Sequence, residues 1–454
     1  MTTSTKLKEL DRAKYLHPFT NYKKYAEKGG NIYTRAEGIF LYDTDGKELL
    51  DGMSGLWCTN LGYSQEKIVQ AVTAQLEQLP YYNSFFGCAN DAAVSMADEL
   101  TKIMPDSMDH VFFTNSGSEA NDTNIRLVHR YFDLLGKPNK KMIISRENAY
   151  HGSTIAAASL GGMSAMHKQF TPLPYVDYVP QPYAFAEDAG LSSEEFGLKC
   201  AQALADKIDA LGVDNVAAFI AEPIQGAGGV IVPPASYWPA VQKVLDERDV
   251  LFISDEVICG FCRTGSWFGS DHFGTKPDLI TFAKGVTNGY QPLGGVGVGS
   301  RVAEVLLASD SEFAHGFTYS GHPVACAAGL ATLNIYHELG TVDYVTNDIA
   351  PYWKSKWQTL KDHPIVGETR TLGMLGALEL VREMPSRTRL APGDAAGSVC
   401  RDAAVGNGLM VRAVGDSIIS APPLICTRDE IDLLVDRLTT ALDLTAKHYG
   451  INVL

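Results

Sequence analysis

The sequence predicts an α/β protein: a large domain built on a mostly parallel sheet of the seven-stranded type, covered by helices. From about residue 110 to 300, short runs of β-branched and aromatic residues alternate with stretches of helical periodicity. This alternation is typical of parallel sheets, because a crossover between parallel strands needs a long connection, usually a helix. The two ends of the chain lack the alternation, so we expect them to form a smaller α+β domain.

Both ends carry signals of their own. Near the N-terminus, the segment GIFLYDTDGKELLDG predicts a hairpin that turns at Asp45–Gly46. Near the C-terminus, Thr427 and Glu430 form a capping box, which predicts the start of the last helix. That helix presents an apolar face made of Ile431, Leu434, Val435 and Leu438. We assign the small domain to residues 1–62 and 331–454, and the large domain to residues 63–330.

Six runs predict the strands of the large domain, namely HVFFTN, KMIIS, NVAAFIAEP, DVLFISDEV, PDLITFAK and GGVGVGS. Segments 118–131 and 237–247 between them are expected to be helices. The glycine-rich last run suggests a dinucleotide-binding loop. It follows another strand and opens no helix with a distal acid, so we interpret it as a tightly packed strand.

Composition limits the possible functions. The chain has 454 residues, of which 45% are hydrophobic and 20% are charged, and its formal net charge of −15 argues against nucleic acid or an anionic membrane as the main partner. The first residues, MTTSTKLKELDRAKY, are polar and predict no secretory signal, and no stretch has the apolar length of a membrane span. We therefore expect a cytoplasmic protein.

The eight cysteines are scattered along the chain, as is typical of reduced thiols. Cys259 and Cys262 form a CxxC pair, but no second pair or histidine spacing accompanies them, so we expect two incidental buried thiols and no metal site.

Chemically active residue types follow the expected strands at one edge of the sheet. Asp255, Lys284 and Glu222 each end a strand, and residues 150–152 (Tyr-His-Gly) and 116–118 (Ser-Gly-Ser) follow two others. Ligands of open α/β sheets bind beyond the carboxyl ends of the strands. A sheet needs no such residues for stability, so we expect a binding site there.

The segment TNSGSEANDTN runs from a strand through small residues into a helix, and free N–H groups at a helix start bind anions. It matches neither a P-loop nor a dinucleotide fingerprint, so a single phosphate suits it better than a triphosphate. An ordinary capped helix is the alternative.

A phosphate site, a carboxylate and a lysine amine at one sheet edge suggest pyridoxal phosphate. Lys284 would form the Schiff base, Asp255 would keep the pyridinium nitrogen protonated, and Tyr150 would stack on the ring. A salt bridge between Asp255 and Lys284, with Tyr150 in the core, is the alternative for these residues taken singly.

The chain also resembles a known family, the class III aminotransferases, which are fold-type I enzymes that use pyridoxal phosphate. The segment FISDEVICGFCRTGSWFGSDHFGTKPDLITFAKGVTNGYQPLGGVGVG resembles the signature region of that family. NSGSEAND, AYHGST, AEPIQGAGGV and HGFTYSGHPVACAAGLA match further blocks in the same order, and the resemblance extends from LWCTNLGYS to GLMVRAVGDSIISAPPL. It is greatest to the ω-amine and putrescine–pyruvate branch.

The resemblance implies roles for residues around the cofactor. Lys284 and Asp255 would be catalytic, the first as the cofactor-bound lysine that moves the proton and the second as partner of the ring nitrogen. The other implied cofactor-binding residues are Ser116, Gly117, Ser118, Tyr150, His151, Glu222, Val257 and Thr318. Among them, Thr318 would reach a phosphate across a dimer interface, so the resemblance implies a homodimer or a tetramer.

The resemblance also implies a substrate pocket lined by Phe19, Trp57, Phe86, Tyr150 and Arg412. Arg412 would bind the carboxylate of the keto acid. Ornithine and 4-aminobutyrate aminotransferases carry an acid where this chain has Ala227, so no acid would hold the arginine here.

Together with these residues, the resemblance implies a transaminase that moves the amino group of a primary amine or diamine, such as putrescine, to pyruvate. A decarboxylase or aminomutase of the same fold is an alternative. A catalytically silent relative is a further alternative, which the pairing of Lys284 with Asp255 argues against.

Overall fold

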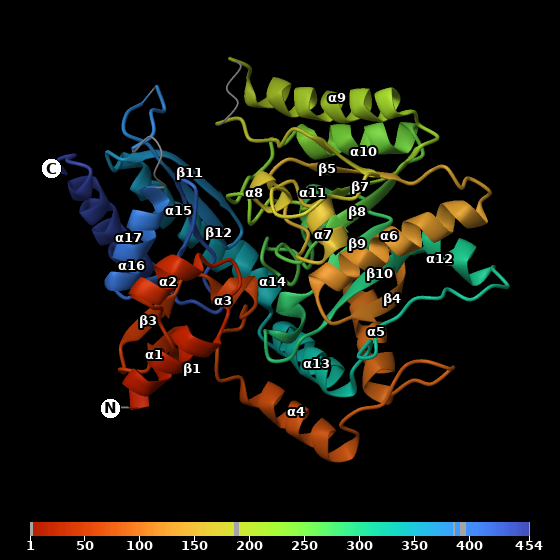
Figure 1. Ribbon diagram of the computed structural model, residues 1–454, viewed down its shortest axis with the longest axis horizontal. Helices are drawn as coiled ribbons and strands as arrows, with labels where there is room; N and C mark the ends of the chain where they lie inside the picture. The colour runs from red at the N-terminus through yellow and green to blue at the C-terminus, as the bar shows by residue number, and fades with distance from the viewer. Residues whose placement is uncertain (1–2, 186–189, 385, 391–395, 454) are drawn as a thin grey trace.

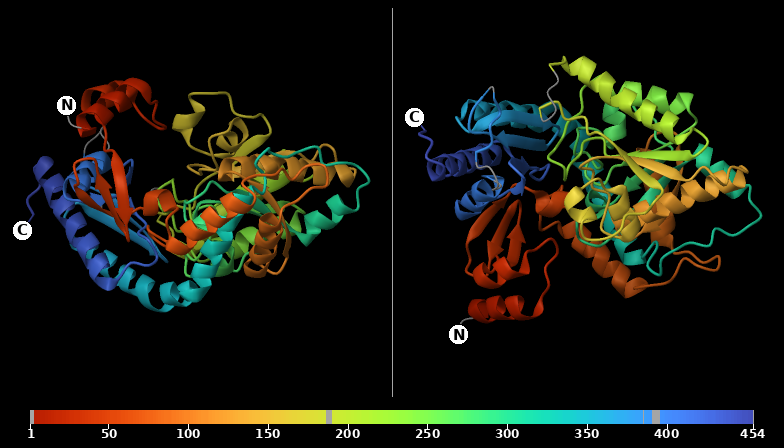
Figure 2. Two further views of the ribbon diagram at one scale, coloured as in Figure 1. Left: turned by 90° about the horizontal axis from the view of Figure 1, so that it is seen from below. Right: turned by 45° about the horizontal axis from the view of Figure 1, so that its top comes forward.

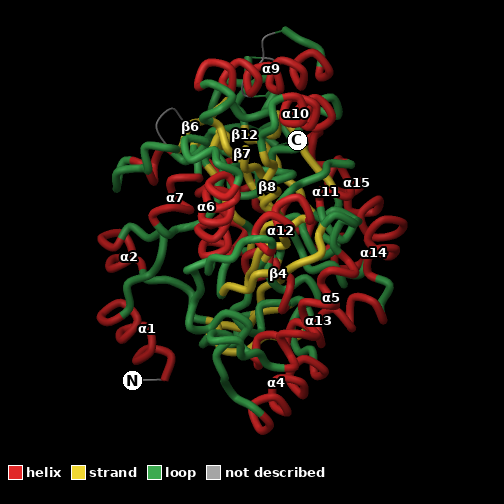
Figure 3. Tube along the Cα trace, turned by 90° about the vertical axis from the view of Figure 1, so that its right-hand side faces the viewer, coloured by secondary structure: helices red, strands yellow, loops and turns green. Residues whose placement is uncertain are grey.

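The computed structural model describes residues 3–185, 190–384, 386–390 and 396–453. A seven-stranded sheet with the helices around it forms the larger part of the protein. Two four-stranded sheets lie beside it (Figure 1). The strands run through the interior and helices surround them (Figure 3). The α/β architecture predicted from the sequence is confirmed.

The large sheet has the strand order β4-β10-β9-β8-β7-β5-β6. Neighbouring strands run parallel, except that β10 is antiparallel to both β4 and β9. The strands are β4 (Met108–Thr114), β10 (Gly294–Gly299), β9 (Leu279–Phe282), β8 (Leu251–Asp255), β7 (Val216–Ala221), β5 (Met142–Arg146) and β6 (Val176–Val179). All six predicted runs belong to this sheet. The sequence analysis missed β6, because its run VDYV is short and half polar.

Helices pack on both faces of this sheet because its strands are apolar on both sides. One face packs against α6 (Gly117–Leu134) and α12 (Ser300–Leu307), and the other against α9 (Ser193–Leu211) and α10 (Tyr237–Glu247). Adjacent strand residues therefore enter different cores. Ile143, Ile220 and Ile253 lie in the first, and Ile144, Phe219 and Phe252 lie in the second. The predicted helix 237–247 has these bounds in the structure, and the helix predicted at 118–131 is α6.

Three helices lie below the sheet in Figure 1, where α13 (Pro323–Glu338) packs against α4 (Glu66–Gln78) and α5 (Asp91–Ile103). The remaining short elements of this part are α3 (Ser54–Trp57), α7 (Ile155–Leu160), α8 (Ser164–His167), α11 (Gly269–Phe273) and the 3₁₀ turn η1 (Lys284–Thr287).

The N-terminal segment forms helices α1 (Thr3–Lys14) and α2 (Tyr22–Lys28) and a small sheet in the order β1-β2-β3-β13. Its strands are β1 (Tyr33–Glu37), β2 (Phe40–Asp43), β3 (Glu48–Asp51) and β13 (Leu409–Met410). β2 and β3 form the predicted hairpin around Asp45–Gly46.

The C-terminal segment forms the second small sheet, in the order β11-β12-β15-β14. Its strands are β11 (Val366–Leu372), β12 (Leu375–Leu380), β15 (Ser417–Ser420) and β14 (Arg412–Val414). The helices are α14 (Thr341–Tyr344), the π turn η2 (Val345–Ile349), α15 (Ala350–Thr359), the 3₁₀ turn η3 (Leu360–Asp362), α16 (Ala396–Gly406) and α17 (Arg428–His448). The predicted capping box, Thr427 with Glu430, begins α17.

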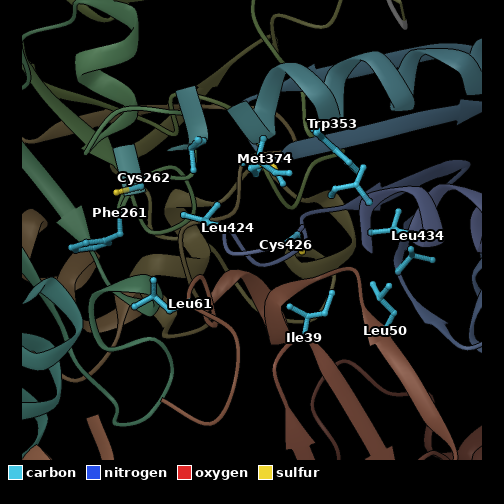
Figure 4. Packing of buried hydrophobic residues seen from close by; sticks show 14 of the residues in the cluster. Ile39, Leu50, Leu61, Phe261, Cys262, Trp353, Met374, Leu424, Cys426 and Leu434 are labelled. Atoms are coloured by element: carbon cyan, nitrogen blue, oxygen red, sulfur yellow. The ribbon is translucent and has the colours of Figure 1, made fainter. Parts of the chain in front are cut away.

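The two ends of the chain are joined, as predicted, because β13 pairs in parallel with β3. They lie at the same end of the molecule (Figure 2). Figure 4 shows the shared core, in which Ile39 and Leu50 of the N-terminal segment approach Leu434 of α17. The domain limits at residues 62 and 330 stay a prediction.

The eight cysteines are free thiols, and Cys259 and Cys262 are buried. Within the described ranges, no helix combines the length and apolar character needed to cross a bilayer. No cluster of three or more metal-ligating side chains occurs among the same residues.

Tight packing of two tryptophans predicts a stability effect. Trp353 and Trp357 are buried with ring centres 4.5 Å apart, and a Cβ on Gly376 of β12 would lie 2.7 Å from the first ring and 2.9 Å from the second. Gly376→Ala should therefore lower the free energy of unfolding by about 1–3 kcal/mol, measured by urea denaturation. Gly406→Ala is the control, because its Cβ would meet nothing within 4 Å. An equal loss in both variants would contradict this explanation.

Candidate active site

Two adjoining cavities open at the carboxyl ends of the large-sheet strands. The inner cavity, of about 80 Å³, is lined by Gly117, Ser118, Tyr150, His151, Gly152, Glu222, Asp255, Val257, Ile258 and Lys284. The outer cavity, of about 510 Å³, shares Tyr150, Ile258 and Lys284 with it and extends toward Trp57 and Arg412. The strand-end residues that the sequence singled out thus meet at one place.

Lys284 follows β9 and has a left-handed backbone, with φ of 53°. Its half-buried side chain enters both cavities, with Nζ 5.1 Å from the centre of the Trp57 ring. Among the described residues, no carboxylate lies within salt-bridge distance of this amine, so the alternative of a salt bridge with Asp255 is wrong. Burial lowers the pKa of Lys284, which favours the neutral, nucleophilic amine.

Asp255, the last residue of β8, is held by three hydrogen bonds. Its Oδ2 lies 2.7 Å from His151 Nδ1 and accepts from Asn121 Nδ2 at 2.9 Å, and its Oδ1 accepts from the Val257 backbone N–H at 3.2 Å. The three side chains Asp255, His151 and Asn121 are buried. The carboxylate is therefore fixed in the wall of the inner cavity.

Asn121 also ties α6 to β9. Its Oδ1 accepts from Thr281 Oγ1 at 2.7 Å, and Asn124 donates to the same Thr281 hydroxyl at 2.7 Å. The sequence analysis missed this role of Asn121. Two buried asparagines three residues apart on one helix face were the available signal, since such amides need partners.

The predicted anion site lies at the N-terminus of α6, where Ser116 caps the helix by accepting from the Glu119 N–H. Ser118 Oγ accepts from the Ser153 N–H at 3.1 Å. Gly152 has φ of 140°, and a Cβ there would lie 2.5 Å from Ser118 Oγ. Glycine is therefore required for this close approach of the loop to the helix N-terminus, the positive end of the helix dipole, which suits an anion.

Glu222 lines the inner cavity and bonds the backbone of Tyr150. One carboxylate oxygen accepts from the Tyr150 N–H at 3.1 Å and the other from the Gly226 N–H at 2.9 Å. Burial raises the pKa of Glu222. This carboxylate supports the loops on both sides of Tyr150, whose hydroxyl lies 3.0 Å from Ser153 Oγ.

Glu256, the residue after Asp255, belongs to the interior. Its carboxylate accepts from the Gly269 and Ser270 N–H groups, at 2.8 and 2.7 Å, and it lines neither cavity. Burial raises the pKa of Glu256 to about 7.

The outer cavity has an aromatic wall and a guanidinium. Arg412, on β14, lies with its Cζ 5.2 Å from the centre of the buried Trp57 ring, and burial lowers its pKa. The Arg412 side chain makes no hydrogen bond or ion pair with the residues that the structure describes. Phe19 borders the opening, with its ring centre 6.3 Å from that of Tyr150.

Three predicted residues line neither cavity: Ser116, whose hydroxyl caps α6, and Thr318 and Phe86, which lie elsewhere. Thr318 and Phe86 are exposed, and neither lines the cavities of its own chain. The placement of Phe86 in the pocket therefore does not hold within a single chain, because its side chain is 96% exposed. The segments that carry both residues are neighbours, since Tyr81 Oη donates to the Thr318 carbonyl at 2.7 Å.

The inner cavity fits pyridoxal phosphate. A helix N-terminus faces the place of a phosphate, a fixed carboxylate faces that of a ring nitrogen, and Tyr150 and Val257 line the cavity between them. The buried His151 Nε2 has no hydrogen-bond partner among the described residues, which leaves it available for a bound group.

The comparisons with known proteins agree with this geometry. The profile of the family described as aminotransferase class-III matches residues 24–442. The putrescine–pyruvate aminotransferase of Pseudomonas aeruginosa is 50% identical over 448 residues, which cover 98% of each chain. The diaminobutyrate–2-oxoglutarate transaminase of Halomonas elongata is 41% identical and covers 98% of this chain and 97% of its own. The crystal structure of the ω-transaminase of Pseudomonas jessenii in complex with PMP superposes with a TM-score of 0.95 at 40% identity, over 98% of this chain and 100% of that one.

The lowered pKa of Lys284 predicts how the amine reacts with pyridoxal phosphate. An amine is nucleophilic when neutral, so a pKa below the ordinary 10.5 shifts its reactivity to lower pH. When cofactor-free protein is mixed with pyridoxal phosphate, the rate of appearance of lysine-bound absorbance should level off below pH 10.5. Nα-acetyl-lysine, whose amine is exposed, is the reference, and Lys284→Ala should give no such absorbance. Identical pH profiles for protein and reference would contradict the prediction.

Proposed function

This chain belongs to the class-III aminotransferase family, and from that premise we propose that it transfers the amino group of putrescine, or of a related polyamine or arylalkyl amine, to pyruvate. The products are an aldehyde and alanine. The aminotransferase activity and its dependence on pyridoxal phosphate are family properties. Support for this choice of substrates comes from the outer cavity, which combines aromatic walls with one unpaired guanidinium, and from the 50% identical putrescine–pyruvate aminotransferase.

When bound, pyridoxal phosphate supplies an electron-accepting ring and carries the amino group between the two substrates. We assign the binding of its phosphate to the α6 N-terminus with Gly117 and Ser118, and the contacts with the ring faces to Tyr150 and Val257. Thr318 would complete the phosphate site from the partner subunit.

Asp255 and Lys284 have distinct tasks in this proposal. The Asp255 carboxylate keeps the ring nitrogen protonated, and its bonds to His151 and Asn121 prevent it from turning away. The Lys284 amine, whose pKa burial lowers, would take the proton from the reacting carbon of the substrate and deliver it to the cofactor carbon that bears the amino group.

Arg412 allows one pocket to take two unlike substrates. The keto acid carries a carboxylate, which a guanidinium binds through two hydrogen bonds. The amine lacks that group, so an unpaired guanidinium beside it is unfavourable and should turn outward. Ala227, buried in the wall of the outer cavity, offers no acid that would hold Arg412 in one position.

We also propose that the chain forms a homodimer or a tetramer. Tyr82, Phe86, Val94 and Tyr319 are exposed large apolar side chains, and Phe86 and Thr318 come from neighbouring segments. A face of this kind is typical of a protein interface. Each chain would then contribute Phe86 and Thr318 to the site of its partner. A cytoplasmic location agrees with eight free thiols and is part of the same proposal.

An amine panel with pyruvate as the fixed acceptor tests the proposed reaction. Putrescine, a longer polyamine and an arylalkyl amine should each give alanine and aldehyde in equal amounts. 4-Aminobutyrate should react at least about tenfold less efficiently, because its carboxylate is two methylene groups away from the amine-bearing carbon and does not match the place in which Arg412 binds the carboxylate of pyruvate, which is bonded directly to the reacting carbon. With an α-amino acid in place of the amine, release of carbon dioxide without alanine would point to the decarboxylase, and absence of alanine and aldehyde with every amine would overturn the proposal.

Arg412→Ala should weaken the keto-acid half-reaction selectively. Loss of a desolvated carboxylate pair costs roughly 2–4 kcal/mol, so the apparent affinity for pyruvate should fall strongly, while reaction with the amine stays near normal. Stopped-flow absorbance follows the two half-reactions separately. Arg428→Ala is the control, since this exposed arginine pairs with Asp348 outside the site. Equal loss in both half-reactions, or none in either, would remove Arg412 from the acceptor site.

A further inference from the structure

The loop from Gln225 to Ile231 forms one wall of the outer cavity through Ala227. Gln225 and Ile231 close the loop by pairing their backbones. Val230 within it has φ of 50°, a left-handed conformation that is strained for a β-branched residue. Such a backbone persists only where surrounding groups hold it in place.

One such group is Arg370 of β11, which comes from the C-terminal sheet. Its Nη2 donates to the Gly229 carbonyl at 2.9 Å and its Nε donates to the Val230 carbonyl at 3.3 Å. The Arg370 side chain is 7% exposed, so these are buried, charge-assisted bonds. The arginine therefore binds the strained turn itself.

The strand register explains why the guanidinium is fixed at this place. Glu368 of β11 lies directly opposite Glu379 of β12, and like charges in such a pair repel. Arg370 follows Glu368 by two residues, so it projects from the same face and donates to both carboxylates. Tyr183 donates to both glutamates and places its ring 4.6 Å from the Arg370 Cζ. If the Arg370 guanidinium moved out of this place, the Glu368 and Glu379 carboxylates would repel each other without a positive charge between them.

The first half of the loop has its own anchors in the large domain. Glu222 accepts from the Gly226 N–H, and the Gln225 side chain donates to the Glu147 carbonyl at 2.9 Å. Ala227 thus lies between anchors on two different sheets. Removal of the Arg370 bonds would free the second half of the loop and leave the first half attached.

We propose that Arg370 is a positioning residue for transamination, which holds the Ala227 wall in place and so sets the width of the outer cavity beside Arg412. Arg370 lines neither cavity and acts through the Gly229 and Val230 carbonyls. The inference rests on the proposed use of the outer cavity by both substrates. Its consequence is selectivity by size: a fixed wall favours small amines over bulky ones.

The test compares three variants of the cofactor-loaded protein. Arg370→Met removes both bonds to the loop, and Arg370→Lys keeps the charge between the glutamates but has no guanidinium fork. Tyr183→Phe is the matched control, because it removes the hydroxyl that bonds both glutamates and accepts from Arg370 Nη1, and leaves the Arg370 bonds to the loop. The measurements are kcat and KM for putrescine and for a bulky arylalkyl amine with pyruvate, cofactor content, unfolding temperature, and hydrogen exchange of residues 225–231.

In Arg370→Met, we expect KM for putrescine and pyruvate to rise about tenfold, and the preference for the small amine to fall by a similar factor, since a displacement of about 1 Å in a site has effects of this size or larger. The kcat and cofactor content should change little, because Lys284 and Asp255 are untouched. For Arg370→Lys, KM and the preference for the small amine should lie between the values of Arg370→Met and those of the parent protein. Hydrogen exchange of residues 225–231 should accelerate in both arginine variants. Tyr183→Phe should lower the unfolding temperature but leave the preference between amines and the hydrogen exchange of the loop unchanged.

A purely structural role for Arg370 gives a different pattern. The inference is overturned if the arginine variants lose activity toward all amines equally with unchanged preference, or if Tyr183→Phe changes the preference as much as they do. If Arg370→Met does not fold, the preference of Arg370→Lys between the two amines and the hydrogen exchange of its residues 225–231 decide whether the inference holds. A parent protein that forms no alanine would refute the proposed function, whereas the exchange of residues 225–231 would still decide whether Arg370 holds the loop.

Discussion

The buried hydrogen bonds around Asp255 are the constraint on which the site depends. Asp255 ends β8, His151 follows β5, and Asn121 lies one turn into α6, so a single carboxylate joins three elements. Asn121 extends the network to Thr281 on β9, the strand that leads to Lys284. An unpaired carboxylate would be costly at this depth, and three bonds offset that cost. The carboxylate, the amine and the helix N-terminus are thereby held in one arrangement.

The second constraint is the border between the large sheet and the C-terminal sheet. Glu222 fixes the large-domain side, since one carboxylate supports both the Tyr150 loop and the loop that carries Ala227. β14 brings Arg412 to the outer cavity, and β11 at the other edge of the same sheet brings Arg370 to the Ala227 loop. The position of one sheet therefore sets both the guanidinium that faces the substrate and the wall beside it.

Four residues around these cavities have a strained backbone. Lys284, Trp57, Phe19 and Val230 are non-glycine residues with φ between 50° and 59°, and they line the cavities or belong to the loop in their wall. Each such conformation costs on the order of 1–3 kcal/mol and persists where packing determines it. The strain turns the Lys284 side chain out of the strand direction and into the site.

Local sequence patterns were sufficient to predict the layered fold and the residue types at the site. Strand and helix periodicities are local, so they indicated six strands of the large sheet, and strand-end residues such as Asp255 and Lys284 followed from them. The tertiary structure decided what no local pattern encodes. The direction of β10 leaves no trace in periodicity, and the bonds of Asn121 to Asp255 and of Arg370 to Gly229 join segments more than 100 residues apart. Phe86 shows the same limit, since its side chain is exposed and lines neither cavity of its own chain. Contacts of this kind depend on how whole helices and strands pack against each other. They cannot be predicted from the residues adjacent in the sequence, because the partners come from distant segments.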